Sequence, residues 1–156
     1  MESPRPTEIE RWAVSSDAED RRCAAEHPKA PAAVLRRLAD DEVPEIQQAV
    51  ARHPNTPLAV VLRLAEDHPV AVLQNPTRPM WAVEQPGFLS QMTPDALRAL
   101  VEQESVPQAW LRWTVRQDEP EYREVRQAIL ANSESPAEIV RAVWNREGQE
   151  REAVRV

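Results

Sequence analysis

The chain has 156 residues, of which 42% are apolar and 29% are charged, and its formal net charge is −7. This balance is typical of one globular domain and excludes an intrinsically disordered chain. With 15 prolines but only 2 glycines, the sequence excludes glycine-rich phosphate loops and a fold of tight β-hairpins. The single cysteine, Cys23, excludes an intrachain disulfide and a metal cluster held by cysteines alone.

The charge balance and the polar start of the chain bear on its partners and its location. An acidic chain disfavours binding to nucleic acids and to anionic membranes, because both need a basic footprint. The opening residues MESPRPTEIE lack an apolar signal segment, and no stretch approaches the ~18 apolar residues of a membrane span. We therefore expect a cytoplasmic protein that does not enter membranes and carries no cofactor.

Taken in chain order, the predicted elements form an internal repeat that fills residues 1–156 as a single domain. A weak first copy covers residues 6–30. The two clearest copies contain His-Pro, two further residues and a second proline, at residues 27–31 and 53–57. The second proline opens an apolar run and recurs at Pro31, Pro57, Pro79, Pro107 and Pro136.

Each of these prolines is predicted to begin an amphipathic α-helix. Proline is tolerated at the first helical position because its missing N–H would have no intrahelical partner there. The residues three, four and seven positions later are mostly apolar, which places them on one helix face. In three copies these residues are Val34, Leu35 and Leu38; Val60, Val61 and Leu64; and Ile139, Val140 and Val143.

An acidic turn and a second, shorter helical piece are predicted to complete each copy. The turn contains aspartates such as Asp41, which can cap the helical piece that Pro44 begins. A proline after His or Asn then ends the copy. One such unit cannot bury its apolar face alone, whereas stacked units can. The pattern therefore predicts an all-α solenoid of about six repeats, each with one longer helix and one short helical piece.

The run HPNTPLAVVLRLAEDHPVAVLQNP, residues 53–76, resembles the leucine-rich repeat variant family, a bacterial repeat related to HEAT and armadillo solenoids. The resemblance is closest over residues 22–79. It implies α-helices that alternate with 3₁₀-helices in a right-handed superhelix. Some members carry an amino-terminal iron–sulfur cluster on several cysteines, which Cys23 alone cannot supply. The family shares no catalytic residues, so the resemblance implies an architecture and little about function.

An irregular segment, residues 80–100, interrupts the repeat. Pro86 and Gly87 stand where the helix after Pro79 should continue, and the helical pattern restarts at Thr93 and Pro94. We expect this helix to be broken or replaced by a loop plus an extra helix. The interruption is either a binding pocket or a tolerated insertion.

The histidines and the cysteine have structural interpretations. His27 and His53 occupy equivalent places in adjacent repeats, where later repeats carry Asn75 and Asn132. Equivalent positions in packed helical repeats lie roughly 8–10 Å apart, too far to share a zinc ion with bonds of about 2 Å. Exchange with Asn favours turn-capping hydrogen bonds over metal binding. Cys23 aligns with an alanine and is predicted to be a buried, inert thiol.

Two tryptophans and a set of arginines are the candidate partner-binding residues. Trp113 holds a position that is usually polar in other repeats, and Trp81 lies beside the broken helix. Both are candidate exposed interface anchors, with core packing as the alternative. Arginines recur five and six positions after the anchor prolines and form a predicted ladder for carboxylates or phosphates. A solvated face paired with glutamates is the alternative for these arginines, Arg36, Arg37, Arg63, Arg112 and Arg141.

These observations predict a non-catalytic solenoid that binds a protein or peptide as an adaptor, scaffold or inhibitor. The alternative is a HEAT-like nucleic-acid-binding solenoid that uses the arginine ladder. An enzyme with a site at residues 86–94 is the third reading, although no catalytic constellation is evident. The apolar residues Ala153, Val154 and Val156 also predict self-association through the carboxy-terminal copy, residues 149–156.

Overall fold

The computed structural model describes residues 7–153, and within that range the chain is all-helical. It contains eleven α-helices and two 3₁₀-helices there, and no strand. None of these helices is long and apolar enough to cross a membrane. The elements are α1 (Glu8–Trp12), α2 (Ala18–Glu26), α3 (Ala32–Leu38), α4 (Pro44–Arg52), α5 (Leu58–Arg63), α6 (Pro69–Leu73), α7 (Arg78–Glu84), η1 (Phe88–Gln91), α8 (Pro94–Val101), α9 (Gln108–Val115), η2 (Pro120–Tyr122), α10 (Arg123–Ala131) and α11 (Ala137–Ala153).

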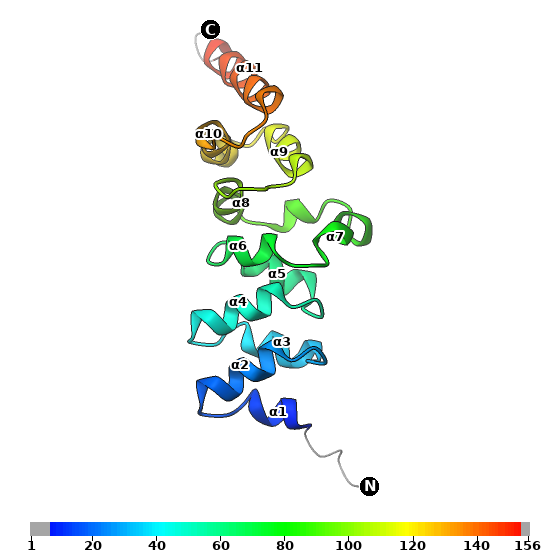
Figure 1. Cartoon of the computed structure of the whole chain (residues 1–156). Helices are drawn as coiled ribbons and strands as arrows, with labels where there is room; N and C mark the ends of the chain where they lie inside the picture. The colour runs from blue at the N-terminus through cyan, green and yellow to red at the C-terminus, as the bar shows by residue number, and fades with distance from the viewer. Residues whose placement is uncertain (1–6, 154–156) are drawn as a thin grey trace.

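The helices stack in chain order along an elongated molecule, with α1 and α11 at opposite ends (Figure 1). The even-numbered helices form a continuous column, because α2 packs on α4, α4 on α6, α6 on α8 and α8 on α10. The odd-numbered helices pack beside this column, and α1, α3, α7 and α9 lie to its right in Figure 1. Each helix thus meets mainly its near neighbours in the chain.

The predicted apolar faces form the core between the helices. Leu35, Leu38 and Val61 are almost fully buried, as are Leu111 and Val143 in the later copies. The spacing of three and four residues that identified these positions in the sequence is therefore confirmed, because it places them on the inner face of each helix.

In most copies the helix begins one residue after the anchor proline and not, as predicted, at the proline. Pro31, Pro57 and Pro107 are N-cap residues with extended backbones, and the helices begin at the next residue. The prediction of proline at the first helical position is correct for the second helix of several copies, as at Pro44 and Pro69. Proline suits both places, since neither needs its N–H.

The prediction that each copy ends in a short 3₁₀ piece is wrong. The second helix, α4, has nine residues and exceeds the seven of α3, and α10 also has nine. Within residues 7–153 only Phe88–Gln91 and Pro120–Tyr122 are 3₁₀. The α-helical form follows from the spacing of Ile46 and Val50, which are both buried and lie four residues apart on one face.

The helix after Pro79 is not broken as predicted, because α7 has seven residues, as many as α3, and the helix at the end of the irregular segment is not an extra one. α7 ends at Glu84, and Gly87 adopts a left-handed conformation with φ of 83°. Thr93 then caps α8 by accepting a hydrogen bond from the Ala96 N–H at 3.1 Å. Because α8 packs between α6 and α10, it is the second helix of its own repeat. The irregularity is therefore confined to the turn around η1.

The two ends of the repeat array differ from the middle. The weak first copy contains α1, which begins after a capping box between Thr7 and Glu10. The last copy is one uninterrupted helix of 17 residues, α11, without an acidic turn. Of the residues on which the self-association prediction rests, Val154 and Val156 lie outside the described range.

Candidate functional site

A series of turn residues at equivalent places caps the ends of the repeats. His27 and His53 accept a hydrogen bond at Nδ1 from the N–H two residues later, each at 3.1 Å. Asn75 and Asn132 accept the same bond at Oδ1, each at 2.9 Å. The predicted turn-capping role of the histidines is thus confirmed, and it explains why asparagine replaces them.

The same side chains also join adjacent repeats. Because His53 accepts at Nδ1, its Nε2 carries the proton and donates to the His27 carbonyl at 2.9 Å. Asn75 Nδ2 donates to the carbonyls of Ala51 and His53, at 2.8 and 3.2 Å. Asn132 Nδ2 makes the equivalent bonds to the carbonyls at the end of α8, those of Val101 and Gln103. These residues form a turn ladder: His27, His53, Asn75 and Asn132.

The turn ladder is interrupted at Gln103, which holds the equivalent place four residues before Pro107. Its longer side chain folds back and donates to the Ala99 carbonyl of its own helix at 3.0 Å. In the turn that follows, Ser105 has a φ of 62°, the single positive value among the described non-glycine residues. This position, where no side chain joins the two repeats, directly follows the irregular segment, so the repeats are joined less regularly there.

Asn75→Ala is expected to lower the free energy of unfolding by about 2–3 kcal/mol, because it leaves buried carbonyls and the Thr77 N–H without partners. Urea unfolding followed by circular dichroism measures the change. Gln103→Ala removes only a bond within one helix and should cost less than about 1 kcal/mol. Equal losses for the two variants would contradict a joining role for the turn ladder.

Trp81 is not an exposed interface anchor, and that prediction is wrong. Its side chain is 2% exposed, and its ring stacks on Trp110 with the centroids 6.1 Å apart and an interplanar angle of 18°. Phe88 meets both rings edge-on, at 6.0 and 5.5 Å. The indole N–H donates to Thr77 Oγ1 at 3.0 Å. Trp81 is therefore a core residue that holds α7 and the insertion together.

Trp113 is half-buried, with its ring edge-on to Tyr122 at 5.9 Å. The neighbouring Arg112 is exposed and forms an ion pair with Glu138 of α11. It also donates to Gln108 Oε1 at 3.2 Å. Trp113 thus packs partly against the core and is not a fully exposed anchor, whereas Arg112 presents a guanidinium that already has a surface partner.

The remaining predicted arginines are exposed on other odd-numbered helices. Arg63 of α5 pairs at 2.6 Å with Asp40, which follows α3 in the preceding repeat. Exposed ion pairs of this kind contribute about 0–1 kcal/mol, so a ligand carboxylate can displace the partner at little cost. The exposed arginines of α3 and α11 are Arg36, Arg37 and Arg141.

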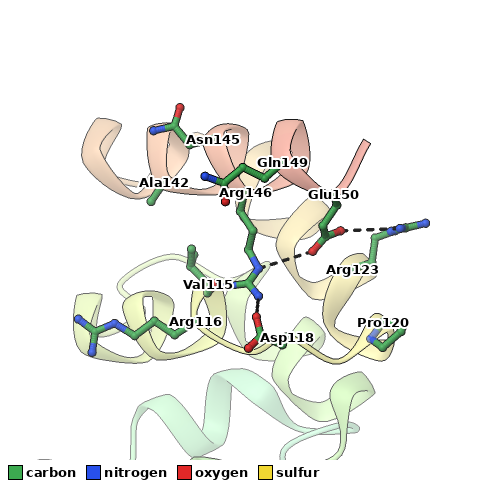
Figure 2. A pocket seen from close by; sticks show the side chains of 10 residues that line it. All are labelled: Val115, Arg116, Asp118, Pro120, Arg123, Ala142, Asn145, Arg146, Gln149 and Glu150. Atoms are coloured by element: carbon green, nitrogen blue, oxygen red, sulfur yellow. Dashed lines mark hydrogen bonds and ion pairs between the residues drawn. The ribbon is translucent and has the colours of Figure 1, made fainter. Parts of the chain in front are cut away.

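An open cleft of about 730 Å³ lies between α9, the turn after it and α11, and sequence reasoning missed it (Figure 2). Arg146 crosses the cleft, donating to the Val115 carbonyl at 2.9 Å and pairing with Asp118. Arg116 and Arg123 lie at opposite ends of the view. The cleft thus presents cationic groups at both ends and an arginine held by carboxylates in the middle.

Behind the cleft, Arg126 is fully buried. Its guanidinium donates to the Gln117 carbonyl at 3.1 Å and to Glu150 at 2.9 Å. Glu147 lies 3.7 Å from Arg126 Nε, beyond hydrogen-bond range, so the Nε group and the Glu147 Oε1 atom have no bond among the described residues. The second half of α11 is thus attached through buried charges.

The position of Arg126 within its repeat is the sequence signal that could have identified it. It lies six residues before Asn132, as Arg21 and Gln47 lie six residues before His27 and His53. In all three copies this residue reaches the following repeat: Arg21 bonds Asp41, Gln47 bonds His68, and Arg126 bonds Glu150.

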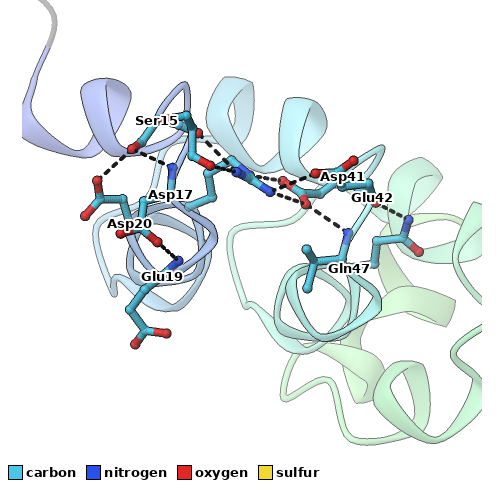
Figure 3. Close-up of polar contacts among 10 residues, drawn as sticks. Ser15, Asp17, Glu19, Asp20, Asp41, Glu42 and Gln47 are labelled. Carbon is cyan, nitrogen blue, oxygen red and sulfur yellow. Dashed lines mark hydrogen bonds and ion pairs between the residues drawn. The ribbon is translucent and has the colours of Figure 1, made fainter.

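The Arg21 example shows how such a contact links three segments (Figure 3). Arg21 Nε donates to Asp41 at 2.7 Å, and its Nη1 donates to the Ser15 carbonyl at 3.1 Å. Asp41 also accepts from the Val43 N–H at 3.0 Å. Burial alone would raise the pKa of Asp41, but the hydrogen bonds from Arg21 and Val43 outweigh it, and the pKa lies below its ordinary value.

Cys23 is exposed on the outer side of α2, and the prediction of a buried thiol is wrong. The buried positions of this helix are Ala24 and Ala25. Aligning Cys23 with Ala49 misjudged burial, because Ala49 itself is only half-buried.

A smaller cleft of about 380 Å³ lies between α5 and the segment from Gln91 to Ala96. Leu62 and Met92 line it, and Arg63 stands among its lining residues. The irregular segment therefore contributes to a surface hollow beside one of the candidate arginines.

Comparison of the chain with protein-family models, with curated proteins and with solved structures finds no match. The resemblance to the leucine-rich repeat variant family remains a prediction from the residues.

Proposed function

We propose that the chain is a cytoplasmic, non-catalytic module that binds a protein or peptide, built as a right-handed solenoid of about six helical repeats. Stacked repeats commonly present one extended face to a partner. The observation that carries the proposal is the recurrence of exposed arginines on α3, α5, α9 and α11, with the half-buried Trp113 among them. Arg112 and Trp113 of α9 form the centre of this binding face, which extends to Arg36, Arg37, Arg63 and Arg141.

Charge favours a protein over a nucleic acid as the partner. The chain carries a net charge of −7, and Arg63 and Arg112 are already paired with Asp40 and Glu138. Nucleic-acid binding depends on uncompensated cations that release counterions from phosphates. Because Arg36, Arg37 and Arg141 are exposed, the test also examines nucleic-acid binding.

The test is capture of a partner by the tagged full chain from a lysate of its source organism, with and without nuclease. Arg112→Ala/Trp113→Ala is expected to lose a nuclease-resistant protein partner by at least about tenfold, since aromatic and arginine side chains dominate interface energetics. Mass spectrometry of the captured proteins gives the measurement, and circular dichroism checks that the helices remain.

Arg98→Ala/Trp12→Ala is a matched control. Arg98 pairs with a glutamate of a later helix, as Arg112 does, and the Trp12 ring lies 6.3 Å from that of His27. This control should retain the partner. Capture that disappears on nuclease treatment would replace the proposal with the nucleic-acid alternative, and equal loss in both double variants would remove the site.

A further inference from the structure

Helix α7 begins earlier relative to its anchor proline than its counterparts do. Its N-cap is Thr77, two residues before Pro79, whereas Pro57 is itself the N-cap of α5. Trp81, the fourth residue after the N-cap, is therefore buried, as Val61 is in α5. Val83 is the sixth residue after the N-cap and is 72% exposed, at the place where α5 carries the exposed Arg63. An apolar side chain thus takes an outward position that holds arginine in a regular repeat.

Helix α7 exposes an apolar surface. Met80 is 50% exposed and lies three residues before Val83, so the two share one side of the helix. Across residues 79–87 the single charged side chain is Glu84, in a chain that is 29% charged. Apolar groups gathered on a surface in this way mark interaction sites. We call Met80 and Val83 the α7 patch.

Several contacts fix the orientation of α7. Trp81 is locked between Trp110 and Phe88, and Arg78 donates to the Leu73 carbonyl at 2.6 Å. Turning the α7 patch inward would expel the Trp81 ring from the core, which would expose a large apolar surface. The outward position of the patch is therefore a stable property of the fold.

Exposed arginines lie on both sides of α7 along the stack (Figure 1). α5, which precedes it, carries Arg63, and α9, which follows it, carries Arg112 and ends at Arg116. Their surface carboxylate partners are exposed and exchangeable. The outer positions of α5, α7 and α9, five or six residues after the N-cap, thus run from cationic to apolar and back to cationic.

We propose that the α7 patch is the docking site for a protein segment with apolar residues at its centre and acidic residues at both ends. This inference rests on the proposed function and names the class of partner for the same face. A second copy of the chain fits less well, because a two-fold contact places the same arginine-bearing helices against each other.

The test uses a fluorescent amphipathic peptide with leucines at its centre and glutamates at both ends, titrated into the full chain and followed by anisotropy. The same peptide with lysines at its ends is the control probe. We expect tighter binding of the glutamate probe, with affinity that falls as salt is raised. Preference for the lysine probe, or no difference between the two probes, would overturn the proposal.

Met80→Ser/Val83→Ser is expected to weaken the glutamate probe by about tenfold, as loss of a central apolar contact does at interfaces. The matched control is Val14→Ser/Val70→Ser, which removes two similarly exposed apolar side chains elsewhere on the molecule, 57% and 48% exposed. It should leave the affinity unchanged. Equal weakening by both double variants would overturn the α7 patch as the site.

Two further measurements address the other occupants and the dependence on the proposed function. Sedimentation that shows a dimer lost in Met80→Ser/Val83→Ser, or binding of phosphatidylserine vesicles that displaces the probe, would overturn the proposal. In the lysate assay, a partner kept by this variant but lost by Arg112→Ala/Trp113→Ala leaves the proposed function in place and removes only the α7 inference. Loss in both variants supports both.

Discussion

Replacing Arg126 with methionine is expected to lower the free energy of unfolding by about 3–5 kcal/mol, the usual effect of removing one member of a buried ion pair. The guanidinium is fully buried and bonds Gln117 and Glu150. Methionine fills much of the volume of the arginine side chain, so the loss of stability comes mainly from the carboxylate charge that is left without its partner. That charge is on Glu147, which is 8% exposed, together with part of that on Glu150. Urea unfolding followed by circular dichroism gives the measurement.

Two further variants separate buried charge from general destabilisation. Arg98→Met removes an exposed arginine that pairs with Glu124 at 3.2 Å and should cost less than about 1 kcal/mol. Adding Glu147→Gln to Arg126→Met should restore part of the loss, because the neutral amide removes the unpaired buried charge while Gln127 can still bond it. A double variant no more stable than Arg126→Met alone would contradict the role assigned to Glu147.

The helix faces of the regular repeats were predictable because each follows from spacing within one short segment. Leu35 and Val61 occupy the same place after a proline, and a three- and four-residue period leaves one choice of buried face. The turn residues were predictable for a related reason. His53 and Asn75 occupy the same position in successive repeats, and each carries an acceptor atom that reaches the N–H two residues later.

Features that depend on contacts between copies were not predictable in this way. Trp81 is buried because Trp110, almost thirty residues later, provides a ring for it to stack on. Arg126 is buried because α11 continues past the point where other repeats turn and brings Glu147 and Glu150 over it. Cys23 shows the limit of alignment between copies, since the aligned Ala49 is itself only half-buried and a small residue can stand on a partly exposed face.

Trp81→Ala is expected to lower the free energy of unfolding by about 3–5 kcal/mol, the range for truncating a fully buried tryptophan. The change removes the stack on Trp110 and the edge contact of Phe88, and it leaves Thr77 Oγ1 without its indole donor. Chemical unfolding measures the loss, and the near-ultraviolet circular dichroism of the stacked indoles should fall with it. Trp144→Ala, at a tryptophan that is 59% exposed, should change stability by less than about 0.5 kcal/mol.

The same variant connects stability to binding. Without the Trp81 ring, α7 loses the packing that keeps Met80 and Val83 turned outward, and the Arg78 bond to the Leu73 carbonyl remains. We expect that single bond to be too weak to stop the helix from placing its apolar face against the core. Trp81→Ala should therefore weaken the glutamate-ended probe even at temperatures where the protein remains folded, whereas Trp144→Ala should not. A variant that loses stability but binds the probe as tightly as the unchanged chain would show that the orientation of α7 does not depend on Trp81.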